Sequence, residues 1–360
     1  MTSTESHDSL ARPPERSRIP ALDSMRGVAI LMVVASHLMP GYLFPEESQL
    51  GEIVNSLGTG GVLLFFFLSG YLIFRNLHRQ PLPLFLARRF FKLFPAYWIN
   101  VAFVAMMGLL FVDYPRHDWP TYIVNFFMLQ DFFRDQNISI NYWTLVVETR
   151  FYILIALQFY FLADKRLLAL PGVTLLLNVA FWVAFKRGSV LLSYLPVFYV
   201  GAEIYRAEIA KWSRSAVTQL MVVTTIVAAS MLPFVFHNIS SAIYIVVLAA
   251  GFVLVLRKGL HAAWLSFFGR ISYSFYLYHG TLGYELFRLF KSGTVPIGLQ
   301  AIMIFVITAI TASLSFYFIE EPGVRFGRAI EKTRLRWIQP QAAPRPEGAP
   351  STVSVDRAQL

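Results

Sequence analysis

Two side chains that could act together in acid–base chemistry lie on one apolar segment near the N-terminus. Ten residues separate Arg26 from His37. In an α-helix, eleven steps of about 100° bring them to within roughly 20° of one another, with a rise of about 16 Å. The arginine could bind an anionic group and the histidine could transfer a proton. The alternative is a surface-anchoring arginine and a core histidine bonded to a backbone carbonyl.

A second group of candidates is basic. Arg88, Arg89 and Lys92 come just before another apolar segment. Arginine offers phosphate a planar fork and lysine offers it a point charge, so the cluster predicts a phosphate site. Anionic lipid headgroups, or simple anchoring at the membrane surface, would explain the same cluster.

A carboxylate completes the predicted site. Trp143 opens a later apolar segment and Glu148 lies five residues further on. If this segment enters from the outer surface, Glu148 lies at a depth similar to that of His37. The sequence therefore predicts that the two pair as a base and the group that orients it. Arg150 points to the opposite face, where we expect a structural ion pair.

Three further residues are candidates. Asp23 lies three residues before Arg26 and can hold it by an ion pair on one helix. Ser69 offers a hydroxyl beside Gly70, which permits close approach of helices, although packing alone would explain both. His279 lies in an aromatic run, where a role in the site and a place in a packed core are equally open.

The composition indicates a membrane protein. Of 360 residues, 56% are apolar and only 14% are charged, against about 45–50% and about 25% in soluble domains. A membrane span needs roughly 20 apolar residues, so the chain could supply on the order of ten. It contains no cysteine, which excludes disulfides, thiolate metal ligands and cysteine nucleophiles. We predict no metal site.

The expected fold is all-α, a polytopic membrane bundle of about ten transmembrane helices. The segments expected to span are Leu22–Leu38, Gly60–Phe74, Ala96–Val112, Trp143–Leu162, Leu167–Phe185, Val190–Tyr205, Ala216–Phe236, Ala242–Leu256, Trp264–Phe287 and Ile297–Phe318. Tyr122–Phe133 is too short to cross and is expected to be an interfacial or re-entrant helix.

The basic charge is best explained by topology. The net charge is +10, and with ten spans most Lys and Arg side chains lie on the side of the N-terminus, as the positive-inside rule requires. Both termini should then be cytoplasmic, and no nucleic acid partner is needed. We expect a disordered tail over residues 1–19, a membrane domain over 20–325, and a mobile tail over 326–360 that is basic and then rich in Pro and Ala.

In their order along the chain, the motifs resemble those of the integral-membrane acyltransferase 3 family. They lie at residues 19–27 with His37, 66–73, 88–98, 143–152, 269–279 and 319–322. The resemblance covers roughly residues 20–325. Bacterial members of this family O-acylate polysaccharides, lipid-linked sugars and some antibiotics. By this resemblance, Arg26 and His37 match an essential pair. Arg89 and Lys92 match a cytoplasmic basic pair in which the second residue is more usually arginine.

The resemblance implies a multi-pass O-acyltransferase of the bacterial cytoplasmic (inner) membrane. Acyl-CoA, expected to be acetyl-CoA, would place its phosphates on Arg88, Arg89 and Lys92 as a co-substrate, with no tightly bound cofactor. His37, aided by Glu148, would deprotonate a hydroxyl of the acceptor. The expected acceptor is a carbohydrate or lipid-linked glycan, and the alternative is a small molecule such as a macrolide.

Other possibilities stay open at this point. A covalent acyl-enzyme at His37 or Ser69 is compatible with the sequence, and the oligomeric state is not predicted. Buried His, Glu and Arg would also suit a proton-coupled transporter. Against a transporter, the chain shows no internal repeat and no matched pair of helices broken by Gly or Pro. A structural scaffold would have no use for a buried Arg and His face.

Overall fold

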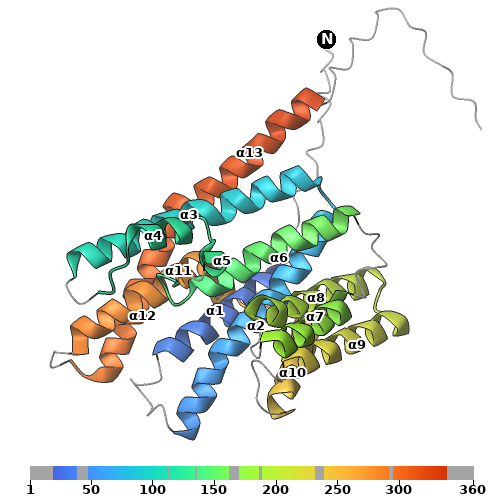
Figure 1. Ribbon diagram of the computed structural model, residues 1–360, viewed down its shortest axis with the longest axis horizontal. Coiled ribbons are helices and arrows are strands. Elements are labelled where there is room, and N and C mark those ends of the chain that lie inside the picture. Colours follow the sequence, from blue (N-terminus) through green and yellow to red (C-terminus); the bar gives the residue numbers. More distant parts are fainter. Residues whose placement is uncertain are drawn as a thin grey trace, which may run out of the picture.

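The computed structural model describes residues 19–38, 48–111, 114–133, 136–161, 170–185, 189–231, 239–291 and 295–338. Within these ranges the secondary structure is helical and contains no strand (Figure 1). The prediction of an all-α chain is therefore confirmed for the part of the chain that the structure describes. The predicted tail over residues 1–19 lies outside these ranges except for Ile19.

Ten of the helices in the described ranges correspond in order to the ten predicted apolar segments. They are α1 (Pro20–Leu38), α2 (Gln49–Leu77), α3 (Leu82–Leu110), α6 (Tyr142–Phe161), α7 (Leu170–Phe185), α8 (Val190–Ile209), α9 (Arg214–Met231), α10 (Ile239–Lys258), α11 (Ala263–Lys291) and α12 (Ile297–Ser315). Among the described residues, four helical stretches are long and apolar enough to cross a membrane: α1, α2, α3 and the continuous helix 297–330. The full number of spans and the side of the termini stay predictions.

Glycines bring α1 and α11 into backbone contact. A Cβ atom added to Gly27 would lie 2.0 Å from the carbonyl oxygen of Leu265, and one added to Gly269 would lie 1.8 Å from that of Asp23. Such reciprocal contacts leave no room for a side chain on either helix, which is how small residues allow close helix packing. The contact fixes the relative height of the arginines that flank the two glycines.

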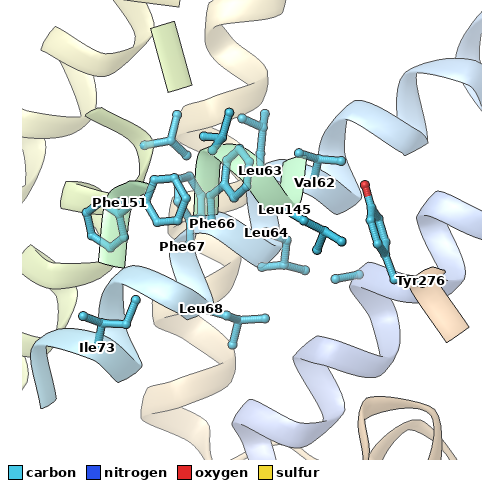
Figure 2. Packing of buried hydrophobic residues seen from close by; sticks show 14 of the residues in the cluster. Val62, Leu63, Leu64, Phe66, Phe67, Leu68, Ile73, Leu145, Phe151 and Tyr276 are labelled. Carbon is cyan, nitrogen blue, oxygen red and sulfur yellow. The ribbon is translucent and has the colours of Figure 1, made fainter. Parts of the chain in front are cut away.

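Glycines also bring α2 and α8 into backbone contact. Gly70 and Gly201 each face a backbone carbonyl oxygen of the other helix, 1.9 Å from where a Cβ would lie. The predicted close approach at Gly70 is thus confirmed. Beside this crossing, the ring of Phe198 lies between those of Phe66 and Phe151, at centroid distances of 4.4 and 4.0 Å. Figure 2 shows Phe66 and Phe151 in this buried cluster, which joins α2, α6 and α8.

The short predicted helix is the pair α4 (Trp119–Phe126) and α5 (Gln130–Phe133). The hydroxyl of Tyr97 donates to the carbonyl oxygen of Asn125 at 2.7 Å, and the indole N–H of Trp98 donates to that of Phe126 at 3.1 Å. Both donors lie near the middle of α3, about 18 Å from its C-terminal end. The segment therefore packs alongside α3, and the interfacial and re-entrant interpretations both stay predictions.

The end of α12 departs from the predicted pattern. A π-helix (Phe316–Glu320) follows it and leads directly into α13 (Glu321–Ile338). The first part of the predicted basic tail is therefore helical, because the chain continues without a break from the π-helix into α13 and through Pro322. In Figure 1, α13 extends away from the bundle after passing α3. The Pro- and Ala-rich part of the tail, 339–360, lies outside the described residues.

Candidate active site

A cavity between α1, α2, α3, α6, α11 and the π-helix that follows α12 collects most of the charged candidates. It has a volume of about 80 Å³, and we call it the basic cavity. In the described part of the chain its charged lining residues are Arg26, Arg89, Lys92, Arg270, Glu148 and Glu320. With every one of these side chains ionised, the lining carries two more positive than negative charges. The structure thus brings the predicted Arg26 together with Arg89 and Lys92.

The predicted contact between Asp23 and Arg26 is present, with 3.9 Å between Oδ1 and Nη1. Arg89 is held from the other side by aromatic rings. Its guanidinium lies 5.1 Å from the ring centroid of Tyr152 and 5.5 Å from that of Phe85. The contact with Asp23 orients Arg26, and the two ring contacts orient Arg89. These contacts do not neutralise all the cations of the basic cavity.

Arg88 does not join the basic cavity, contrary to the sequence prediction. Its Nη1 donates to the side-chain oxygen of Gln80 at 2.6 Å. Successive residues on a helix point about 100° apart, so Arg88 and Arg89 leave α3 in different directions. The phosphate site proposed from sequence therefore loses one of its three cations, while Arg26 and Arg270 contribute two others.

Glu148 lines the basic cavity, where it accepts hydrogen bonds from two hydroxyls. The Oγ of Ser69 donates to Glu148 Oε1 at 2.5 Å, and the hydroxyl of Tyr152 donates to the same oxygen. Arg150 points away, as predicted, and its Nη1 lies 2.8 Å from the carboxylate of Asp131 on α5. Ser69 and Glu148 are thus brought together in the basic cavity, away from His37.

The predicted pairing of His37 with Glu148 is wrong in this structure. His37 lines a different cavity, near the C-terminal end of α1. The reason lies in where α6 begins: the hydroxyl of Tyr142 donates at 2.8 Å to Asn100, about 15 Å from the C-terminal end of α3. Because α6 begins beside the middle of α3, Glu148 lies further from that end of α3 than a count from a membrane surface assumes.

The cavity that His37 lines has a volume of about 230 Å³, and we call it the histidine cavity. His37 is exposed within it. Polar side chains of Ser36, Asn55, Thr59 and Asn141 and the aromatic rings of Trp143, Tyr194 and Tyr276 are among its lining. The rings of Trp143 and Tyr194 lie 5.2 Å apart. The candidates His37 and Trp143 are therefore in one site.

His279 is the neighbour of His37. Nδ1 of His37 lies 2.9 Å from Nε2 of His279. His279 is buried, with 3% of its surface exposed. The open question about His279 is thus answered by position: it contacts the candidate histidine from α11. An ionisable side chain in an apolar segment was the signal in the sequence, but nothing in the sequence shows that the two histidines meet.

The two cavities meet at a thin boundary. Val62 and Tyr276 line both of them, and Figure 2 shows these two side chains at one edge of the buried cluster. The hydroxyl of Tyr276 is hydrogen-bonded to that of Thr144 at 2.5 Å, which holds the tyrosine in place. A group bound in the basic cavity is therefore one side chain away from the histidine cavity.

Glu320 is the functional candidate that sequence reasoning missed. It is buried, lines the basic cavity and accepts a hydrogen bond from Ser274 Oγ at 2.9 Å. It ends the π-helix, and such single wide turns occur frequently at functional sites. A carboxylate at the end of an apolar run was visible in the sequence, but the direction of its side chain depends on the extra residue in that turn.

Metal chemistry was not predicted from the sequence. Across the described ranges, no group of three or more His, Asp and Glu side chains could hold a metal ion.

Comparison with known proteins gives one family match and several relatives. A family model described as an acyltransferase domain matches residues 19–319. Acyltransferase MdmB from Streptomyces mycarofaciens is 25% identical over 369 residues, which cover 87% of this chain and 93% of that protein. O-acetyltransferase OatA from Staphylococcus aureus is 23% identical, over 84% of this chain and 57% of that protein.

Peptidoglycan O-acetyltransferase OatA from Listeria monocytogenes is 28% identical over 159 residues, covering 39% of this chain and 24% of that protein. The chain thus spans only part of the OatA proteins that it matches. No solved structure matches the chain.

Proposed function

The chain belongs to the acyltransferase family whose model matches residues 19–319, and from this premise we propose that it moves an acetyl group from acetyl-CoA to a hydroxyl of a glycan. The family makes the chain a transferase, so a proton-coupled transporter is no longer needed to explain its buried charges. The acceptor is an envelope polysaccharide or a lipid-linked sugar.

One observation carries the proposal: a cavity with surplus positive charge adjoins a cavity with an exposed histidine, and Val62 and Tyr276 line both. Transfer between two substrates needs a donor site and an acceptor site within reach of one base. The basic cavity suits the donor, because the phosphates of CoA are anions. The histidine cavity suits the acceptor.

The donor site uses Arg26, Arg89 and Lys92. An arginine fork forms paired hydrogen bonds with phosphate oxygens, and an ammonium group adds a point charge. The carboxylates of Glu148 and Glu320 share the cavity, where they offset part of the cationic charge before the donor binds. About 16 Å separate Arg26 from His37 along α1, a distance that the extended pantetheine arm can cover.

The chemistry requires one base. His37 accepts the proton of the acceptor hydroxyl, and the oxygen attacks the thioester carbonyl carbon. The new C–O bond forms, the C–S bond breaks, and the thiolate of CoA takes up this proton from His37 and leaves as the free thiol, which returns His37 to its neutral form. In this scheme transfer is direct, and Glu148 acts in the donor site instead of orienting His37.

The acceptor site favours a sugar. Trp143 and Tyr194 present apolar ring surface, and Asn55, Thr59 and Asn141 present amide and hydroxyl groups in the same cavity. A sugar ring offers both an apolar C–H face and hydroxyls, so it can use the two kinds of surface together. The name of the Listeria relative, a peptidoglycan O-acetyltransferase, supports the same acceptor class.

We further propose that the protein crosses the bacterial cytoplasmic membrane ten times with both termini in the cytoplasm. Acetyl-CoA is cytoplasmic, so the basic cavity must open inward and the histidine cavity outward. Reporter fusions at Gly259 and Pro296 test this: the first should report the cytoplasm and the second the outer side. Equal signals from both positions would contradict the topology.

Purified full-length protein in lipid discs tests the function. With acetyl-CoA and peptidoglycan fragments or lipid-linked sugars, we expect CoA thiol release matched by a gain of one acetyl mass on the acceptor. His37→Ala should abolish transfer, and Arg89→Ala should raise KM for acetyl-CoA. Arg325→Ala is the matched control, because Arg325 is an exposed cation that pairs with Glu321 on α13.

Several outcomes would overturn parts of this assignment. Normal transfer by His37→Ala would remove the histidine from the reaction. An equal rise of KM in Arg89→Ala and Arg325→Ala would move the donor site elsewhere. Acetylation of a macrolide in preference to every glycan would replace the proposed acceptor by the small-molecule alternative.

A further inference from the structure

We infer that His279 is a positioning residue, which holds His37 in the one tautomer that leaves a free lone pair in the histidine cavity. The inference rests on the proposed function, in which His37 is the base. It is carried by a chain of hydrogen bonds that starts at a backbone carbonyl of α11 and ends at His37. Each link fixes the position of one proton.

The first link fixes His279. Its Nδ1 lies 2.9 Å from the carbonyl oxygen of Tyr276 and 3.3 Å from that of Phe275. Carbonyl oxygens only accept hydrogen bonds, so the proton is on Nδ1. The amide nitrogen of Asn141 also lies 3.4 Å from Nδ1, but its shorter hydrogen bond, at 2.9 Å, goes to the Tyr276 carbonyl oxygen. In the neutral ring Nε2 is then unprotonated and is an acceptor.

The second link fixes His37. Nε2 of His279 lies 2.9 Å from Nδ1 of His37. An acceptor on one side requires a donor on the other, so the proton of neutral His37 is on Nδ1. Nε2 of His37 is left with its lone pair, and the His37 side chain is exposed in the histidine cavity. That is the atom from which a base must act.

His279 is held firmly enough to impose this choice. The ring is buried, and the amide of Asn141 donates to the same Tyr276 carbonyl at 2.9 Å. Asn141 is packed so closely on α11 that a Cβ on Gly280 would lie 2.3 Å from its amide nitrogen. The ring of His279 therefore cannot turn over without breaking two hydrogen bonds.

The hydrogen bond between His37 and His279 also stabilises His37 after it has been protonated. When Nε2 of His37 takes the proton of the acceptor hydroxyl, Nδ1–H continues to donate to His279. The carbonyl dipole behind His279 is aligned to favour the new positive charge. The group that accepts the hydrogen bond from a histidine base is more commonly a carboxylate. Here it is a neutral histidine, so no buried anion has to be desolvated.

The direct test is ¹⁵N NMR of histidine-labelled full-length protein in lipid bilayers, at a pH where His37 is neutral. The His37 signals are assigned by their loss in His37→Gln. We expect Nδ1 protonated and Nε2 unprotonated in the wild type, and a mixture of tautomers in His279→Ala. A wild-type ring protonated on Nε2, or an unchanged His37 in His279→Ala, would overturn the inference.

Activity gives a second readout. His279→Ala should lower kcat by about 100-fold, the lower end of what a positioned base contributes, with KM for acetyl-CoA unchanged. His279→Gln, whose side-chain oxygen can accept from His37, should stay within about ten-fold of the wild type. Equal losses in both variants would show that an acceptor at this position is not what matters.

Thr281→Val is the matched control, because Thr281 is also a buried polar residue of α11 and bonds Ser139 at 3.2 Å. It should change neither the tautomer nor kcat. If His37→Ala still transferred acetyl groups while the NMR result was as expected, the proposed base would be wrong and the tautomer assignment would stand.

Discussion

Replacing Gly269 by alanine should separate α1 from α11 and disturb both cavities together. The added Cβ would lie 1.8 Å from the carbonyl oxygen of Asp23 and 3.2 Å from the amide nitrogen of Gly27. An ordinary contact needs about 3.4 Å, so the helices must part by about 1.5 Å. No side chain can rotate to make room, because the atoms that clash belong to the backbone.

The separation of α1 and α11 determines how much stability and acetyl transfer are lost. Overpacking of this kind costs about 1–3 kcal/mol, and we expect the upper end here because only movement of whole helices relieves it. The same movement would lengthen the 2.9 Å contact between His37 and His279 beyond hydrogen-bonding distance. Gly269→Ala should therefore lose both stability and acetyl transfer.

Gly251→Ala provides the control within the same protein. Gly251 lies inside α10, and a Cβ there would meet nothing within 4 Å. Alanine is favoured over glycine in a helix by about 1 kcal/mol, so this variant should be as stable as the wild type or more so. Thermal unfolding in one detergent, followed by tryptophan fluorescence, compares the two. If both variants shifted the midpoint equally and in the same direction, the backbone contact would be refuted.

Three further substitutions probe the cavities. Tyr276→Phe removes the hydrogen bond to Thr144 and should loosen the boundary, so acetyl-CoA hydrolysis without acceptor, measured by thiol release, should rise. Glu320→Gln keeps an acceptor for Ser274 but removes a negative charge, so KM for acetyl-CoA should fall a few-fold; an unchanged KM would place the donor elsewhere. Ser69→Ala should retain most transfer if transfer is direct, whereas complete loss together with an acetylated Ser69 in wild-type mass spectra would show a covalent route.

Much of the fold could be predicted from the sequence. Apolar segments of membrane length mark helices wherever they occur, so the ten segments recur as ten helices in the described residues. Interactions within one helix could also be predicted from the sequence. The pair Asp23 and Arg26 follows from spacing alone. The direction of Arg150, on the face opposite to that of Glu148, also follows from spacing. In each case helix geometry decides the result without help from other segments.

The structure brings together only some of the predicted site residues. Arg26, Arg89 and Lys92 do meet, but Arg88 leaves α3 on another side and bonds Gln80. Glu148 was placed at the depth of His37 because α6 was assumed to start at the membrane surface. In the structure α6 begins beside the middle of α3, and no count along the chain could reveal that shift.

Helix periodicity in the sequence suffices to give the helices, the polar side chains that each one carries, and the single face that holds Arg26 and His37. Which helices bring their polar side chains together follows only from how the helices pack. His37 meets His279, which lies 242 residues away along the chain, because glycines let α1 and α11 touch at the backbone. Packing of this kind depends on shape in three dimensions, whereas helix periodicity is a property of each segment alone.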